Sequence, residues 1–187
     1  WIDHQPATNC EALSSRGADP TSRFFVVDHL RSHGYRYAWA GTDVREPSDQ
    51  INLFDPARPQ AHAPVLYAHP LIDADPQTPI RLFSSVWRYH DIGTFLAKYD
   101  SDRLDRLEAD RGLHIAHTYL DSLSRSAGHR GKSLLMRDGA TVRVRPEVDT
   151  WLAGLAVRQS ERRLWVSGVV AMADHLLAMA SVSLSPV

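Results

Sequence analysis

The nine residues Arg111–Tyr119 read RGLHIAHTY, and they carry the pattern that decides the fold we expect. The charged segment before them, residues 100–111, has leucines at the spacing of a short surface helix. Gly112 suits the position after that helix, because glycine adopts positive φ without steric cost. From there the period changes from helical to extended. The sequence therefore predicts a strand at residues 113–117 that directly follows a helix.

Side chains on such a strand alternate between its two faces. Leu113, Ile115 and His117 share one face, and His114 points to the other. Both faces are apolar at the start, which is typical of an inner parallel strand covered by helices. Active sites in open α/β sheets and (β/α) barrels lie at the carboxyl ends of the strands. His117 is therefore the candidate functional histidine, and His114 is expected to be a partly buried structural residue.

The same succession of helix, glycine and strand occurs earlier in the chain. Ser22 is a suitable N-cap for a helix over residues 23–33, Gly34 closes it, and a strand over 35–40 follows. Repeated units of this kind suit an α/β fold built from βα units. We predict one largely parallel sheet built from residues 35–40, 80–86, 113–117 and 164–166.

Later segments predict further helices and a hairpin. A first helical turn is expected at residues 94–99. Asp138-Gly139 predicts a β-hairpin between 132–136 and 141–145, and Pro146 suits the first turn of the next helix. The inward face predicted for that helix is Val148, Trp151, Leu152, Leu155 and Ala156, and for a final helix over 169–180 it is Met172, Ala173, Leu176 and Leu177.

Residues 44–79 form a different kind of segment, since they hold seven of the eleven prolines. Proline fixes φ and removes a backbone donor, so long helices and central strands are not expected there. We predict an irregular excursion over the carboxyl ends of the strands, with one small strand at residues 65–67.

Composition narrows the function classes. The net charge of −1 argues against nucleic-acid binding, which normally shows a strong basic bias. The arginines between Arg158 and Arg163 are interpreted as a solvated helix end. A single cysteine, Cys10, excludes an internal disulfide and a cysteine-rich zinc site. No apolar run is long enough for a membrane span. The length suits one α/β domain over 1–187, and a start at Trp1 is consistent with a processed chain or a piece of a longer protein.

Three common catalytic motifs do not fit. Gly131-Lys132-Ser133 lacks the first glycine of a phosphate-binding loop, because Ser126 stands there, and a hairpin is predicted where a helix is needed. Neither a Gly-x-Ser-x-Gly elbow nor a His-Glu-x-x-His zinc motif occurs.

Polar residues at predicted strand ends remain as candidates. Imidazole and carboxylate groups at one rim can bind a divalent metal or transfer protons. His29 and His33, by contrast, are expected on a helix surface. Trp39, Trp87 and Tyr119 could form a sugar-stacking platform or could equally be core or lid aromatics. The strand-end residues are Asp3, His4, Asp43, Arg88, His90, Asp91 and His117.

Three stretches together resemble the later part of a polysaccharide deacetylase-like domain. They are Trp1-Ile2-Asp3-His4 with Asn9, the strand 113–117, and Leu164-Trp165-Val166-Ser167-Gly168-Val169 followed by a helix. The resemblance implies a distorted (β/α) barrel and hydrolysis of N-acetyl groups on sugars. Members often bind a divalent metal through an aspartate and two histidines.

The same resemblance assigns roles to individual residues. It makes His117 the general acid, with Asp3 as the second catalytic residue. His4 is the match to the family's metal-binding histidine pair. Position 8, where the second histidine belongs, is Thr8, and Asn9 follows as the other metal ligand.

We therefore expect a carbohydrate-active hydrolase that removes an acyl group from a saccharide with the help of His117 and a divalent metal, zinc in the first instance. Trp39, Asp43, Trp87, Arg88 and Tyr119 are the expected substrate-binding residues. One alternative is a non-catalytic saccharide-binding or structural domain of a larger carbohydrate-active protein. Another is an interaction module that uses the proline-rich segment.

Overall fold

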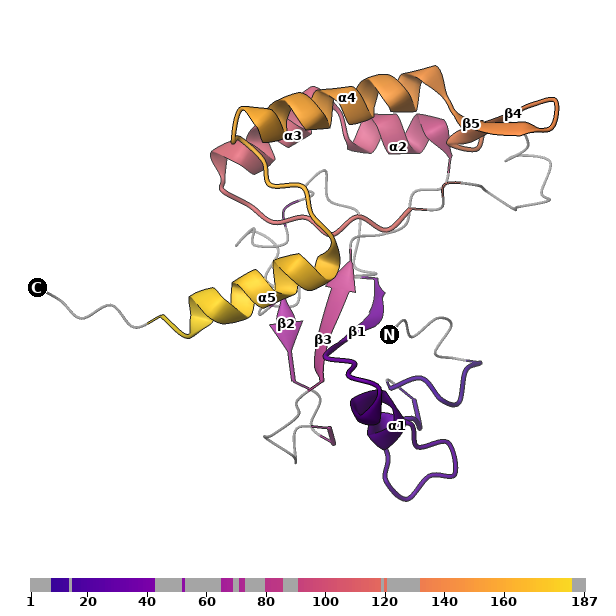
Figure 1. The fold of residues 1–187 in the computed structure, drawn as a ribbon, viewed down its shortest axis with the longest axis vertical. Helices are drawn as coiled ribbons and strands as arrows, with labels where there is room; N and C mark the ends of the chain where they lie inside the picture. Colours follow the sequence, from indigo (N-terminus) through magenta and orange to yellow (C-terminus); the bar gives the residue numbers. More distant parts are fainter. Residues whose placement is uncertain are drawn as a thin grey trace, which may run out of the picture. The chain divides into compact units, whose positions relative to one another are not determined.

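The described residues of the computed structural model are 8–13, 15–42, 52, 65–68, 71–72, 80–85, 91–118, 120 and 132–182. The chain forms two compact units. Unit 1 comprises residues 1–41, 60–85 and 167–187, and unit 2 comprises residues 42–59 and 86–166. The predicted mixture of helices and strands is confirmed (Figure 1). The strands among the described residues form two small sheets and no closed barrel.

Unit 1 is built around a three-stranded sheet. Its strands are β1 (Tyr37–Thr42), β2 (Leu66–Tyr67) and β3 (Arg81–Ser85), in the order β1-β3-β2. β2 is antiparallel to β3. The Arg81 N–H donates to the Arg36 carbonyl over 2.9 Å, so β1 and β3 begin side by side and run in the same direction (Figure 1). The strands predicted at 35–40, 65–67 and 80–86 are confirmed within two residues, but the sheet is mixed rather than parallel.

Helix α1 (Val27–Ser32) begins four residues later than predicted. The N–H of Val26 donates to the Gly17 carbonyl over 3.0 Å instead of closing a helical turn on Ser22. The chain before Val26 therefore stays in turns. The helix ends as predicted, because Gly34 takes a φ of +74° that few other residues adopt.

Helix α5 (Val169–Ala180) has the bounds that the sequence predicted. Ala173 has no exposed surface, but Leu177 is 40% exposed, so the predicted inward face is only partly right. Asp174, next to Ala173, is bound to Arg36 and Tyr37, which fixes the rotation of the helix about its axis. The buried core of unit 1 consists of Leu13, Ala18, Val27, Leu30, Ala38, Ile72, Ile80 and Leu82.

The described residues of unit 2 form three helices, α2 (Ile92–Lys98), α3 (Ser101–Ala109) and α4 (Pro146–Ser160). The first two begin at aspartate N-caps: Asp91 accepts from the Thr94 N–H at 3.0 Å and Asp100 from the Arg103 N–H at 2.9 Å. Asp91 is therefore a helix cap rather than a strand-end site residue. The buried core consists of Phe95, Tyr99, Leu104, Leu107, Leu134 and Val148.

The predicted hairpin and the predicted helix after it are confirmed. β4 (Leu135–Asp138) pairs antiparallel with β5 (Thr141–Val144) through a two-residue loop in which Gly139 has a φ of +60°. Pro146 occupies the first turn of α4. The inward face of α4 is narrower than predicted, since Leu152 is 45% exposed while Val148 is buried.

The segments 113–117 and 164–166 are not strands, so the prediction of one sheet from four segments was wrong. The Leu113 N–H donates to the Asn52 side chain at 3.1 Å, and the Val166 N–H faces the Gln159 side chain at 3.3 Å. Side chains thus accept the backbone donors that a neighbouring strand would otherwise bind. Arg111, not Gly112, takes the left-handed conformation after α3, with a φ of 49°.

The arginines at the end of α4, Arg158 to Arg163, are not simply solvated, which corrects the interpretation of this cluster as a solvated helix end. Arg158 is 9% exposed and donates to Asp105 over 2.7 Å and to Glu108. Burial alone would lower the pKa of Arg158, but the hydrogen bonds to Glu108 and Asp105 outweigh it and raise the pKa. Arg163 also donates to Glu108, at 3.0 Å. We call Asp105, Glu108, Arg158 and Arg163 the α3–α4 charge cluster.

Candidate functional site

The predicted site residues fall into three groups. Asp3, His4, Asp43, Trp87, Arg88 and Tyr119 lie outside the described residues. Asn9 and Trp39 belong to unit 1, and His117 belongs to unit 2.

His117 lies in the connection Gly112–Thr118, which Figure 1 shows as an extended trace leaving α3. Asn52 holds the start of this connection. Its side chain is 5% exposed and accepts the Leu113 N–H. A Cβ on Gly112 would lie 2.4–2.6 Å from the Asn52 side-chain atoms, so only glycine allows this close approach. Gly112 is therefore required here because it has no side chain, and not because of its φ.

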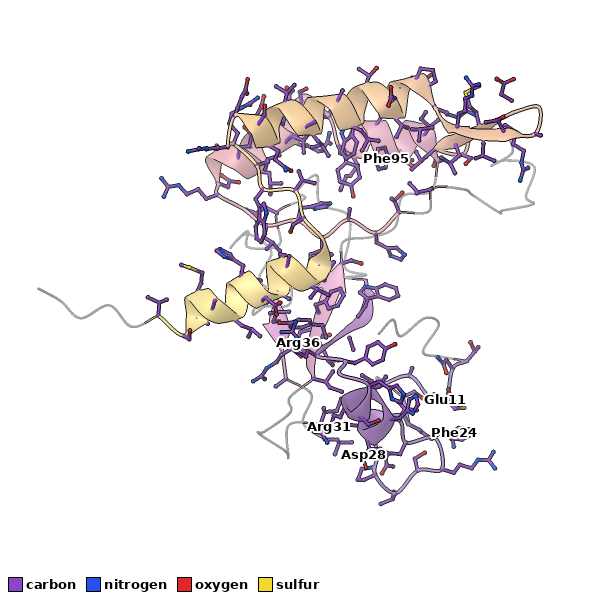
Figure 2. The ribbon with its side chains drawn as sticks, viewed as in Figure 1. Glu11, Phe24, Asp28, Arg31, Arg36 and Phe95 are labelled. Atoms are coloured by element: carbon purple, nitrogen blue, oxygen red, sulfur yellow. The ribbon has the colours of Figure 1, made fainter. Side chains whose placement is uncertain are left out.

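His114 anchors the middle of the connection to the core of unit 2. Its Nε2 lies 3.0 Å from the Tyr99 hydroxyl, and its ring meets the Tyr99 ring edge-on at 5.1 Å. The Tyr99 carbonyl in turn accepts the indole N–H of Trp151 at 2.8 Å. Trp151 packs against Phe95, which Figure 2 labels. The structural role expected for His114 agrees with these contacts.

Ile115 and Leu120 fix the rest of the connection. Ile115 is 5% exposed, and His117, two residues on, is partly buried. Beyond His117 the Leu120 carbonyl accepts the Leu135 N–H at 3.2 Å and the Ser133 hydroxyl at 2.9 Å. The backbone that carries His117 is therefore held on both sides, at Asn52 and at the base of the hairpin.

Trp39 and Asn9 are both engaged locally in unit 1. The Trp39 indole N–H donates to the Ser85 hydroxyl at 3.0 Å, which joins β1 to β3, so a sugar could use only the faces of the ring. The Asn9 side-chain oxygen accepts the Glu11 N–H at 3.1 Å in a tight turn. Neither contact brings a second predicted site residue to Trp39 or Asn9.

A charged contact that the sequence did not predict joins β1 to α5. Arg36 donates to both carboxylate oxygens of Asp174, at 2.6 and 3.0 Å, and the Tyr37 hydroxyl donates to the same carboxylate at 2.5 Å. Figure 2 shows Arg36 beside α5. We call these three residues the β1–α5 clamp. The hydrogen bonds from Arg36 and Tyr37 lower the pKa of Asp174, whereas burial and then Asp174 raise the pKa of Tyr37 to about 12.

One of these residues, Asp174, had a signal in the sequence. Asp174 interrupts an otherwise apolar stretch, and an acid within an apolar helix usually has a partner. Glu108 and Arg158 lie fifty residues apart, and nothing local in the sequence connects them. Asn52 lies in the proline-rich segment, where no periodic pattern marks it.

Within the residues that the structure describes, no three histidine, cysteine, aspartate or glutamate side chains come together as a metal-binding group. No helix in that same part of the chain is both long enough and apolar enough to cross a membrane. No protein-family model, curated protein or solved structure matches the chain.

Proposed function

We propose that this chain is a carbohydrate-active hydrolase of the polysaccharide deacetylase type, with a distorted (β/α) barrel-like fold. It removes an N-acetyl-type acyl group from a saccharide. His117 is the general acid, and Asp3 acts with it. The observation that carries the proposal is the position of His117 in a connection that Asn52, Tyr99 and the hairpin base hold in place.

A positioned imidazole is what this reaction needs. A histidine titrates near neutral pH, so it can hold a proton and deliver it to the leaving amine. Contacts hold the backbone on both sides of His117, and this limits the positions that its ring can take. Such restriction raises the efficiency of proton transfer. The proposed substrate-binding residues are Trp39, Asp43, Trp87, Arg88 and Tyr119.

The proposed metal site consists of His4 and Asn9. Imidazole and an amide oxygen, with the carboxylate of Asp3 next to His4 in the sequence, are ligand types that suit a divalent ion such as zinc. When bound, the ion would supply a Lewis acid for the acyl carbonyl and its attacking water. Asn9 can contribute because an amide oxygen has two lone pairs, of which the Glu11 N–H occupies one.

Replacement of His117 tests the catalytic role. With an N-acetylated oligosaccharide as substrate, His117→Ala should lower turnover roughly a hundredfold or more, the usual scale for general acid–base catalysis. Its melting temperature should stay near that of the parent. His114→Ala is the matched control: it should keep activity but lower the free energy of unfolding by about 1–2 kcal/mol, because it loses the Tyr99 contact. Equal turnover of the His117 variant and the parent would exclude this assignment.

A non-catalytic saccharide-binding or structural domain is the second candidate. The hydrogen bond from the Glu11 N–H to the Asn9 side-chain oxygen favours this second candidate, because that oxygen is then already engaged and not reserved for a metal. Metal analysis separates the two candidates. One equivalent of zinc that is lost in His4→Ala supports the hydrolase, whereas glycan binding without metal supports the second candidate.

A further inference from the structure

Two histidines lie one helical turn apart at the end of α1. His29 is in the helix and His33 is its C-cap, and both side chains are exposed. Their ring centroids are 4.3 Å apart with an angle of 40° between the planes. Residues four apart on a helix face the same way, so the two imidazoles are available to one ligand from solvent.

The hydrogen bonds of His33 determine which of its nitrogens is available. Nδ1 lies 2.9 Å from the His29 carbonyl oxygen, and the Ser32 hydroxyl donates to the same oxygen over 2.9 Å. A carbonyl oxygen only accepts, so Nδ1 carries the proton and Nε2 keeps its lone pair. Histidines that bind metals usually donate their other ring N–H to a carbonyl or carboxylate, which fixes the tautomer and the ring orientation. His33 has this arrangement before any metal binds.

We infer that His29 and His33 form a surface site for a divalent transition metal such as Cu²⁺, Ni²⁺ or Zn²⁺. Imidazole nitrogen is a preferred ligand of all three ions, and Cu²⁺ binds most tightly in the usual order of affinities. Two protein nitrogens chelate the ion, and water completes its coordination because both side chains are exposed. The adjacent Asp28 carboxylate faces Arg31 at 3.7 Å, which leaves the imidazoles as the ligands.

This site is separate from the one proposed at His4 and Asn9, and it does not rest on the hydrolase proposal. An ion held by His29 and His33 would also tie the last turn of α1 to its C-cap. Since the ion binds the folded helix, it should raise the melting temperature of the protein.

Titration of the 187-residue chain with Cu²⁺, followed by electron paramagnetic resonance, tests the inference. We expect one equivalent of Cu²⁺ with the spectral signature of two imidazole nitrogens. His29→Gln and His33→Gln should each weaken binding at this site by roughly tenfold or more, in line with the loss of a ligand or of its supporting contacts. His175→Gln is the control, because His175 is an exposed helical histidine with Ala171 and Met179 one turn away on either side.

The outcomes are distinct. Loss of the two-nitrogen signal in both His29 and His33 variants, with retention in the His175 and His4→Ala variants, supports the site. The two-nitrogen signal surviving in folded His29→Gln overturns it, and so does its loss in His4→Ala. Far-ultraviolet circular dichroism on each variant confirms that α1 and the rest of the fold are retained before the titrations are compared.

Discussion

At the level of single residues, Tyr37 reports most directly on the β1–α5 clamp. Its hydroxyl is buried beside a carboxylate, and both effects oppose formation of the phenolate. Its pKa is raised to about 12 from the ordinary tyrosine value of 10.0. A tyrosine with a raised pKa stabilises the folded state below its unfolded pKa, and this contribution is lost as the pH rises towards the folded value.

Removal of the carboxylate should therefore bring the Tyr37 titration back towards an ordinary tyrosine. We expect the highest tyrosine pKa in an absorbance titration to fall in Asp174→Asn, and the loss of stability between about pH 10 and 12 to diminish. Asp28→Asn, which changes an exposed carboxylate elsewhere in unit 1, should leave that titration unchanged. A parent chain in which every tyrosine titrates near pH 10 would contradict the assignment.

The glycines show what could and could not be predicted for single residues. Gly34 and Gly139 were assigned correctly, because a helix end and a hairpin are local features. The role of Gly112 was assigned to its φ, but the structure uses its lack of a side chain against Asn52. Asn52 is sixty-one residues away from Leu113, the residue after Gly112, and no local sequence pattern indicates a contact over that distance.

At the level of elements, two glycines should respond in opposite directions to replacement by alanine. A Cβ on Gly17 would lie 2.0 Å from the Glu11 carbonyl oxygen, so Gly17→Ala should cost about 3 kcal/mol of stability through a forced backbone shift. Gly154 lies within α4 with nothing within 4 Å of the added Cβ. There Gly154→Ala should stabilise by about 0.5–1 kcal/mol through helix propensity.

Chemical denaturation of both variants measures the two effects. The turns before α1 depend on Gly17, whose carbonyl also accepts the Val26 N–H. The Gly17 variant should therefore lose stability with little change in denaturant slope. Equal stability of the Gly17 variant and the parent would show that the turn can open without cost.

The α3–α4 charge cluster offers a matched pair of arginines. Arg158→Ala removes a nearly buried cation and leaves Glu108 with one partner, so we expect a loss of about 2–4 kcal/mol. Arg163 is 42% exposed, so solvent screens its ion pairs and its removal should cost much less stability than that of Arg158. Thermal and urea unfolding of the two variants check this order. A larger effect for Arg163 than for Arg158 would contradict it.

Most helices and strands could be predicted from the sequence, but the segments that they contact could not. Periodicity and caps located α2, α3, α4, α5 and the hairpin, because 3.6-residue spacing, Pro146 and Asp138-Gly139 act locally. The extended segment after Gly112 has the alternation of a strand, but strand formation also needs a neighbour. Asn52 accepts the Leu113 N–H there. The alternating apolar residues therefore bury Ile115 although the segment does not join a sheet.

At the level of the whole molecule, the two units differ in how the chain builds them. The described helices and strands of unit 2 follow one another in the sequence, from α2 to α4. Unit 1, in contrast, includes α5, which comes after all of them. The β1–α5 clamp joins residues that are 138 apart in sequence. Unit 1 therefore depends on residues that follow unit 2.

A shortened chain that ends at Val166 should lose the fold of unit 1 but keep that of unit 2. It lacks Asp174 and the fully buried Ala173, so amide protons of α1 and β1 should lose protection from hydrogen exchange. Amides of α4 should keep theirs, since the core of unit 2 is retained. Loss of protection in α1 and α4 to the same degree would show that the units do not fold separately.

The dependence of β1 on Asp174 also has a consequence during synthesis. A ribosome releases the chain from its N-terminus, at roughly 5–20 residues per second, and each part can fold only when its partners have emerged. The elements from α2 to α4 emerge before α5, and the Arg36 and Tyr37 side chains next to β1 can bind Asp174 only after α5 has been made. During that interval Arg36 and Tyr37 lack their carboxylate partner, although the residues of the unit 1 core, from Leu13 to Leu82, have already emerged.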